Sequence, residues 1–234
     1  MKSTVEQIRE RFDNDVERFS HLDIGNTAQV DSVLSLELIA EAAAAANPEA
    51  QTLLDIGCGA GNYSLKVLGN IPTVDVTLTD LSQPMLERAC LRVSGATSGK
   101  VRTIQADIRE IDLGEAQFDI IVASSVFHHL RTDAEWRSVF IKLHRALKPG
   151  GTIWIFDLIQ HVMPRVEQRM WERYGRYLTG VKDEAYRNLV FSYIEQEDTP
   201  KPLTFQLDLL RSVGFREIEV LHKNVSFAAF GARK

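Results

Sequence analysis

Short apolar segments alternate with segments of helical periodicity through the middle of the chain. Five apolar segments predict strands, over residues 52–56, 74–79, 101–106, 118–124 and 152–158. Helical patterns lie between most of them, and the clearest is the stripe formed by Trp136, Phe140, Leu143 and Leu147. Strands and helices in alternation predict a mostly parallel sheet with helices on both faces.

The end of the chain departs from this alternation. A helix is predicted over 203–213, followed by two apolar segments, 217–221 and 225–232, that the polar residues 222–224 connect. Because this connection is too short for a crossover helix, the last two strands are predicted to be antiparallel neighbours. The expected fold is a Rossmann-like, doubly wound α/β sheet of seven strands in three layers, mostly parallel with an antiparallel C-terminal hairpin strand.

Two other regions read as helical. Residues 4–46 form helices interrupted near 23–26, and residues 160–200 form helices rich in aromatic residues and arginine, interrupted at Gly175, Gly180 and Pro200. The expected organisation is an N-terminal helical cap, a ligand-binding core and a helical lid inserted into that core. Their bounds are 1–46 for the cap, 47–158 with 203–234 for the core, and 159–202 for the lid.

Composition narrows the class of protein. The 234 residues are 44% hydrophobic and 25% charged, which is ordinary for a globular protein. The net charge of −5 gives no reason to expect a nucleic-acid partner. The N-terminus shows no signal peptide and no apolar stretch reaches the ~20 residues of a membrane span, so a cytoplasmic protein without membrane partners is expected. Two cysteines, Cys58 and Cys90, suggest neither a disulfide framework nor a metal site, and no metal is expected.

The first predicted strand ends in an acid that three glycines follow at alternate positions: Asp55, Gly57, Gly59 and Gly61. Glycine has no Cβ, so such a loop turns sharply and lets a ligand approach the backbone. Open α/β sheets bind their ligands at this carboxyl end of the strands. A dinucleotide fingerprint would place its third glycine where Asn62 stands, so the spacing disfavours an NAD(P)-dependent oxidoreductase.

Two further acids follow the next two strands. Asp80 is suited to accept both hydroxyls of a ribose, although the same residue could serve only as the N-cap of a helix. Asp107 follows the third strand, where an aspartate is also a common turn former. Of these two positions, Asp80 favours a nucleoside ligand.

The order of these motifs resembles that of the class I S-adenosylmethionine-dependent methyltransferases, in their small-molecule branch. The resemblance covers residues 50–158 and, by architecture, the final thirty residues. It implies an enzyme that transfers a methyl group from S-adenosyl-L-methionine to a small-molecule acceptor by in-line displacement, leaving S-adenosyl-L-homocysteine. The cofactor-binding residues that it implies are Asp55, Gly57, Gly59, Gly61, Asp80, Leu81, Met85, Asp107, Ile108 and Ser124.

Two histidines follow the fourth strand, where this family places the reactive methyl group. His128 or His129 could accept a proton from an acceptor hydroxyl, because imidazole is basic near pH 7. A histidine that only shapes the pocket is as consistent with the sequence, since methyl transfer to a nucleophilic atom requires no base. The stretch 12–19 also resembles the segment that folds over the cofactor in many relatives, with Phe19 where tyrosine is frequent.

The predicted lid contains the candidates for acceptor binding. Arginines recur there at helical spacing, at 165, 169, 173 and 176. They could form a solvated helix face, or they could form a clamp for an anionic acceptor. Aromatic residues in the same segment could pack the helices or line a pocket. The expected acceptor-binding residues are Arg169, Trp171, Arg173 and Tyr174.

Two alternatives stay open within the predicted fold. Residues 225–232 and the layout of the lid are similar to the carboxy-S-adenosylmethionine synthases linked to tRNA modification, although the three glycines favour plain methyl transfer. A non-catalytic S-adenosylmethionine-binding module is the other alternative. The sequence also allows a homodimer and does not identify the acceptor.

Overall fold

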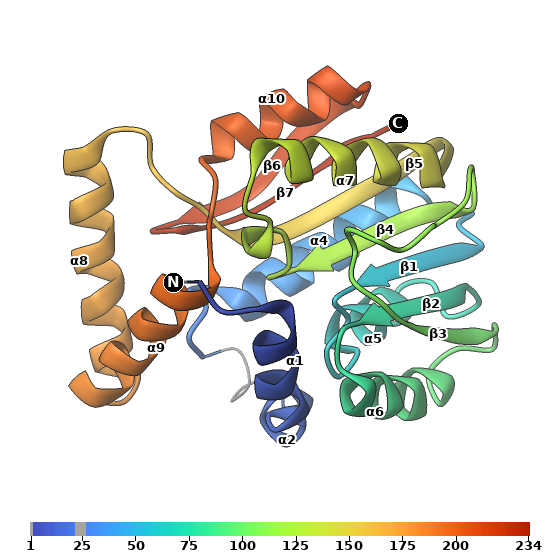
Figure 1. Cartoon of the computed structure of the whole chain (residues 1–234). Coiled ribbons are helices and arrows are strands. Elements are labelled where there is room, and N and C mark those ends of the chain that lie inside the picture. The colour runs from blue at the N-terminus through green and yellow to red at the C-terminus, as the bar shows by residue number, and fades with distance from the viewer. Residues whose placement is uncertain (1, 22–26) are drawn as a thin grey trace.

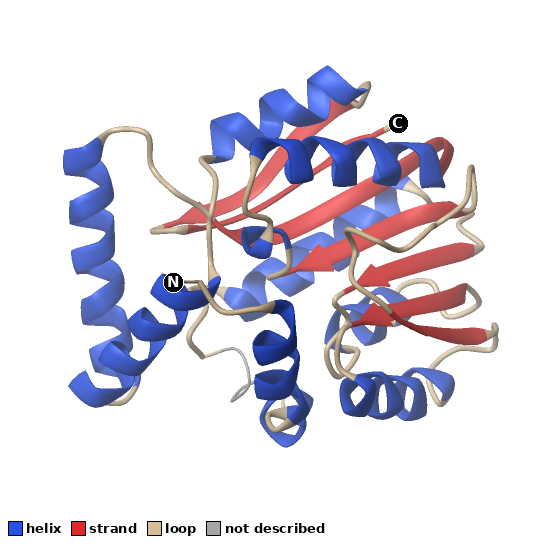
Figure 2. Ribbon diagram, viewed as in Figure 1, coloured by secondary structure: helices blue, strands red, loops and turns tan. Residues whose placement is uncertain are grey.

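The computed structural model describes residues 2–21 and 27–234. Seven strands form one sheet in the order β3-β2-β1-β4-β5-β7-β6 (Figures 1 and 2). The first five are parallel, and β7 lies antiparallel between β5 and β6. The strands are β1 (Thr52–Ile56), β2 (Asp75–Asp80), β3 (Val101–Gln105), β4 (Phe118–Ser124), β5 (Leu147–Leu158), β6 (Arg216–Asn224) and β7 (Phe227–Arg233).

The predicted doubly wound sheet is confirmed, and its helical layers follow from the alternation of apolar side chains along the strands. In β4, Ile120 and Val122 point into one core while Ile121 and Ala123 point into the other. The first core lies under α4 (Ser32–Ala46), α5 (Asn62–Leu68) and α6 (Gln83–Ser94). The second lies under α7 (Asp133–Ala146) and α10 (Leu203–Val213), which Figure 1 shows together above the sheet.

The hairpin at the end of the chain differs from the prediction in its turn. Residues 222–224 belong to β6, and the turn is at Val225 and Ser226, where Val225 has φ 49°. Strand β5 also begins earlier than predicted, at Leu147, beside a register irregularity in β4. Pro149, Gly150 and Gly151 lie within this strand.

The remaining helices lie beyond the carboxyl ends of the parallel strands. They are α1 (Val5–Asp13), α2 (Val16–Ser20), the one-turn 3-10 helix η1 (Phe127–His129), α8 (Pro164–Val181) and α9 (Glu184–Glu197). The predicted interruption near 23–26 lies outside the described residues, and the predicted cap 1–46 contains α1 and α2 together with α4, which packs on the sheet. Among the described residues, no helix is both long enough and apolar enough to cross a bilayer.

A glycine explains how α8 and α9 pack against each other. The predicted interruptions at Gly175 and Gly180 are wrong, because α8 continues through both residues. A Cβ at Gly175 would lie 3.3 Å from Arg187 Cδ and 3.4 Å from Phe191 Cζ, so the missing side chain lets α9 approach closely. At its other end α9 is tied to the N-terminus, since Glu197 binds the Arg11 guanidinium and the Ser3 N–H donates to the Gln196 carbonyl.

Candidate functional site

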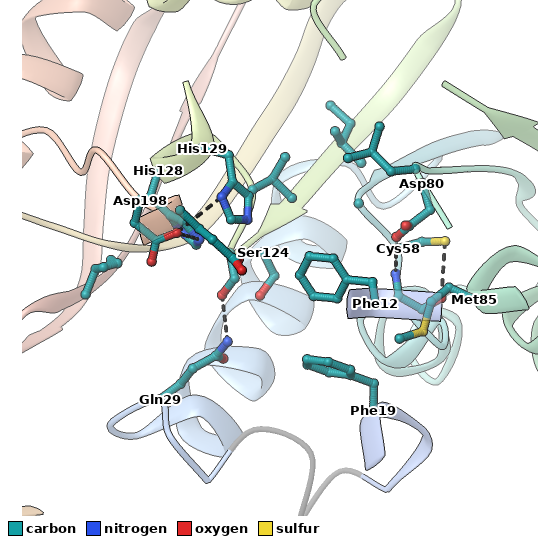
Figure 3. A pocket seen from close by; sticks show the side chains of 18 of the residues that line it. Phe12, Phe19, Gln29, Cys58, Asp80, Met85, Ser124, His128, His129 and Asp198 are labelled. Carbon is teal, nitrogen blue, oxygen red and sulfur yellow. Dashed lines mark hydrogen bonds and ion pairs between the residues drawn. The ribbon is translucent and has the colours of Figure 1, made fainter. Parts of the chain in front are cut away.

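A cavity of about 270 Å³ lies at the carboxyl ends of β1 to β4, between the sheet and helices α1, α2, α8 and α9 (Figure 3). Eleven of the residues predicted to bind a cofactor or take part in catalysis line it, together with residues of α1, α2, α8 and α9. Those eleven are Asp55, Gly57, Gly59, Asp80, Leu81, Met85, Asp107, Ile108, Ser124, His128 and His129. The parallel topology brings these residues together, because they lie at or after the carboxyl ends of the four adjacent strands β1 to β4.

The glycine-rich loop has the backbone conformation that its sequence predicts. Gly57, Gly59 and Gly61 have φ values of 61°, 50° and 84°, which side chains disfavour. A Cβ at Gly57 would lie 2.4 Å from Val126 Cγ2, so Gly57 permits close packing against the β4 loop. A Cβ at Gly59 would meet nothing within 4 Å and would project into open space where the loop lines the cavity. Gly61 instead caps α5 and packs against α6, outside the cavity.

Asp80 connects the glycine loop to the start of α6. The Gly59 N–H donates to one carboxylate oxygen of Asp80 and the Ser82 N–H to the other, each at 2.9 Å. The N-cap of α6 is Ser82, whose hydroxyl accepts from the Met85 N–H, so Asp80 is not the cap. Burial raises the pKa of Asp80 despite its backbone hydrogen bonds. The carboxylate is therefore held in place at the base of the cavity by backbone donors.

Asp55 is buried behind the same loop, with only 2% of its surface exposed. One of its carboxylate oxygens accepts from both the hydroxyl and the N–H of Ser64, at 2.7 and 3.2 Å. Burial raises the pKa of Asp55 to about 7, although the bonds from Ser64 oppose that shift. A group that neutralises the charge of this carboxylate, such as an ammonium, would be favoured beside it.

The raised pKa of Asp55 predicts a specific pH dependence of stability. In the folded chain Asp55 binds its proton up to a pH of about 7, whereas in the unfolded chain it loses it near 3.8. Between these values the folded state holds more protons, so the contribution of Asp55 to the free energy of unfolding falls as pH rises, by at most about 1.4 kcal/mol per pH unit. Chemical denaturation at several pH values should show that Asp55→Asn loses less stability over this range than the unmodified chain. An equal decline in both proteins would contradict the burial of an ionisable Asp55.

Asp107 is engaged by its own neighbour. The guanidinium of Arg109 binds both oxygens of the Asp107 carboxylate, with Nε at 2.9 and 3.1 Å, and the Arg109 N–H donates to it as well. These contacts outweigh burial and hold the pKa of Asp107 below its ordinary value. Asp107 thus stays charged, and Ile108 beside it lines the cavity with its apolar side chain.

The histidines after β4 lie in a cluster that the sequence did not reveal. Asp157, fully buried in β5, binds His128 Nδ1 and accepts the N–H groups of Phe127 and His128. Asp198, just after α9, has a carboxylate oxygen 3.6 Å from His128 Nε2 and 3.2 Å from His129 Nδ1. Burial alone would lower the pKa of His128, but the two carboxylates outweigh it and raise that pKa to about 9.

Sequence reasoning missed both acids of this cluster. Asp157 gave a signal, because it is the one charged residue in an otherwise apolar strand segment, 152–158. Asp198 gave none, since its place depends on how α8 and α9 pack relative to the sheet. Gln29 was missed as well, and its side-chain amide donates to the Ser125 hydroxyl at 2.8 Å, in the cavity wall.

The structure separates the four residues predicted to bind the acceptor. Tyr174 is buried, lines the cavity and donates its hydroxyl to the Ala28 carbonyl at 2.8 Å. Trp171 donates to Glu167 and lies outside this cavity. Arg169 and Arg173 are on the exposed side of α8, away from the cavity, where Arg169 pairs with Glu172. Their spacing identified a helix face, but that face points to solvent.

The N-terminal helices complete the cavity. Phe12 at the end of α1 and Phe19 in α2 line it, with ring centroids 5.7 Å apart (Figure 3). Asn62, the first residue of α5, donates its side-chain amide to the Phe19 carbonyl at 3.0 Å, which ties α2 to the start of α5. The N-terminal segment therefore lies over the open side of the loop.

The chain is similar in sequence to known methyltransferases. Residues 54–153 match the model of a methyltransferase domain. An uncharacterized methyltransferase of Mycobacterium bovis is 31% identical over 52% of this chain and 56% of its own length, and so this chain spans about half of that relative. The carboxy-S-adenosyl-L-methionine synthase of Chromohalobacter salexigens is 27% identical over 77% of this chain and 67% of its own length.

A solved structure shows the same fold over the whole chain. The 1,6-didemethyltoxoflavin-N1-methyltransferase of Burkholderia thailandensis superposes with a TM-score of 0.64 at 17% identity, covering 100% of this chain and 92% of that one. That structure contains 1,6-didemethyltoxoflavin and S-adenosylhomocysteine. The domain match, the curated relatives and the sheet order agree with one another: residues 54–153 match a methyltransferase domain, and the chain is similar to S-adenosylmethionine-dependent methyltransferases in sequence and in fold.

Proposed function

We propose that this chain binds S-adenosyl-L-methionine and methylates a small-molecule acceptor. One observation carries the proposal: the carboxyl ends of four adjacent parallel strands place the glycine loop, Asp80, Asp107 and Ser124 around a single cavity. The relatives support it, because a methyltransferase domain is matched over the strands that build this cavity.

The residues of the cavity fit the cofactor. The open space beside Gly59 leaves room for a ligand against the backbone, and the partly buried carboxylate of Asp80 faces the same cavity as a hydroxyl acceptor. Asp55 supplies a second, fully buried carboxylate, suited to the cofactor's amino group. Leu81, Met85 and Ile108 add apolar side chains for the adenine ring. The product S-adenosyl-L-homocysteine would occupy the same site.

The part of the cavity beyond Ser124 would receive the acceptor. Its wall is largely apolar and comes from β5, β7, α8 and α9, with the side chains Leu158, Phe227, Tyr174, Val190 and Ile194. Such a wall suits a small apolar or aromatic molecule, which it would hold and shield from water. When bound, the cofactor supplies an electrophilic methyl group, and alignment of the acceptor by this wall would provide much of the acceleration.

The two histidines lie at the acceptor end of the cavity, where they could exchange a proton with the acceptor. Because the pKa of His128 is about 9, its imidazole carries a proton near pH 7 and would donate to an acceptor oxygen. His129 has two buried ring nitrogens without a hydrogen-bond partner and is our candidate to receive a proton. Both roles are part of the proposal.

The cavity favours methyl transfer over carboxy-S-adenosylmethionine synthesis. A carboxylated cofactor needs a cation for its added carboxylate. Among the described residues, every arginine that lines the cavity is already paired: Arg11 with Glu197, Arg18 with Asp15, and Arg109 with Asp107. A non-catalytic cofactor-binding module would use the same glycine loop and differ only at the acceptor end. The cytoplasmic location and the homodimer stay predictions from the sequence.

Calorimetry with S-adenosyl-L-homocysteine tests the proposal. The purified chain should bind one equivalent of it, while NADPH, which also carries an adenosine, should give no saturable heat. Mass spectrometry of ligand released from the purified protein should detect the uncarboxylated cofactor. Absence of S-adenosyl-L-homocysteine binding at millimolar ligand would overturn the proposal, and a carboxylated ligand would favour the synthase.

A further inference from the structure

Three metal-ligating side chains converge at the acceptor end of the cavity. His128 and His129 come from η1 after β4, and Asp198 reaches them from the end of α9 (Figure 3). One ligand atom from each lies within 4.8 Å of the others. The Asp198 oxygen is 3.2 Å from His129 Nδ1 and 3.6 Å from His128 Nε2.

The two separations from the Asp198 oxygen are close to those of ligands around one ion. Imidazole nitrogens and carboxylate oxygens bind Zn²⁺ at about 2.0–2.2 Å, which places neighbouring ligands roughly 3–3.5 Å apart. Two histidines and one carboxylate on one side of an ion are also the ligand set of many Fe²⁺ sites, with the opposite positions open. Here the open positions would face the cavity, because all three residues line it.

The buried neighbour of His128 strengthens this interpretation. Asp157 binds His128 Nδ1 and is itself fixed by the N–H groups of Phe127, His128 and Leu158. In most metal sites the outer nitrogen of a ligating histidine donates to an acceptor such as a carboxylate, which sets the tautomer and orientation of the ring. Asp157 thereby leaves Nε2 of His128 as the nitrogen available to a ligand.

The charges around the cluster favour a divalent cation. Arg11 lies nearby, but its guanidinium is occupied by three hydrogen bonds to Glu197. Lys2 reaches only the backbone carbonyls of Glu195 and Asp198. Asp157 and Asp198 are left with the two histidines as their side-chain ion-pair partners in the described part of the chain. A doubly charged ion bound to the two imidazoles would balance the charges of these two carboxylates.

We propose that His128, His129 and Asp198 bind one divalent transition-metal ion of the Zn²⁺, Co²⁺ or Fe²⁺ type, with Asp157 as the positioning residue. In the metal-bound protein the two histidines act as ligands and no longer exchange protons with the acceptor, and the open positions of the ion bind an oxygen of the acceptor or water. The metal site stands on its own geometry and does not depend on methyl transfer.

The test is a titration of untagged, chelator-treated protein with Co²⁺, followed by its visible d–d absorption, and with Zn²⁺ by calorimetry. One equivalent of each should bind. Asp198→Asn and His129→Gln should each weaken binding by more than the about 10–100-fold expected for Asp157→Asn, since they remove a ligand and not its support. His161→Gln is the matched control, because it removes a histidine that pairs with Glu167 outside the cavity, and it should bind Co²⁺ as the unmodified chain does.

Two results would overturn the metal site. One is the absence of saturable Co²⁺ and Zn²⁺ binding at micromolar concentrations, and the other is equal affinity in Asp198→Asn, His129→Gln and the control. Far-ultraviolet circular dichroism and thermal unfolding establish that each variant is folded. Calorimetry of S-adenosyl-L-homocysteine on the same samples separates the two proposals: binding of this ligand without metal refutes the metal site alone, and binding of metal without this ligand refutes the proposed function alone.

Discussion

Replacing Gly59 by leucine is expected to abolish binding of S-adenosyl-L-homocysteine. The added side chain would project into the open space beside the loop, where the ligand would otherwise lie against the backbone. Because Gly59 has φ 50°, the substitution should also lower the free energy of unfolding by about 1–2 kcal/mol. Calorimetry measures the first effect and chemical denaturation the second.

Gly150 provides the matched control for this experiment. It also has a positive φ, 80°, with nothing within 4 Å of its missing Cβ, but it lies in β5 far from the cavity. Gly150→Leu should therefore show a similar loss of stability and unchanged ligand binding. If Gly59→Leu bound S-adenosyl-L-homocysteine as tightly as Gly150→Leu, the ligand could not lie over the glycine loop.

Replacing Asp80 by alanine is expected to weaken S-adenosyl-L-homocysteine binding by about 100-fold. A hydrogen bond to a charged group contributes about 1.5 kcal/mol or more, and two ribose hydroxyls would be lost together. Asp80→Asn keeps the size and one acceptor oxygen, so its affinity should fall between those of Asp80→Ala and the unmodified chain. Calorimetry with the three proteins measures this series.

The control for Asp80 lies at the other end of the same strand. Asp75 begins β2, where it accepts the Lys100 N–H at 2.7 Å, and it does not line the cavity. Asp75→Ala should leave affinity unchanged. Affinity that is the same in Asp80→Ala and Asp75→Ala would show that the carboxylate at the end of β2 does not contact the ligand.

The parts of the fold that were predicted correctly depend on local sequence. β1 and β4 have the predicted bounds, because short apolar segments between polar residues specify buried strands. The spacing of the glycines after a strand likewise predicted a sharp turn, and these glycines have positive φ values in the structure. Since parallel strands end at one edge of the sheet, these local features were enough to place Asp55, Asp80 and Asp107 around one cavity.

The parts that were missed depend on contacts between distant segments. Helical spacing placed Arg169 and Arg173 on one face of α8, but only the packing of α8 against α9 determines that this face is exposed. Gly175 was taken as a helix break, whereas its role is to let Phe191 pack against α8. The pairing of His128 with Asp198 joins residues seventy positions apart and carries no sequence pattern.

The most direct test of the account is a crystal structure of the chain with S-adenosyl-L-homocysteine. We expect the ligand to lie over Gly59, with both ribose hydroxyls on the Asp80 carboxylate and its sulfur directed toward Ser124 and the histidine cluster. A ligand bound elsewhere, or one whose ribose makes no contact with Asp80, would contradict the assignment of this cavity.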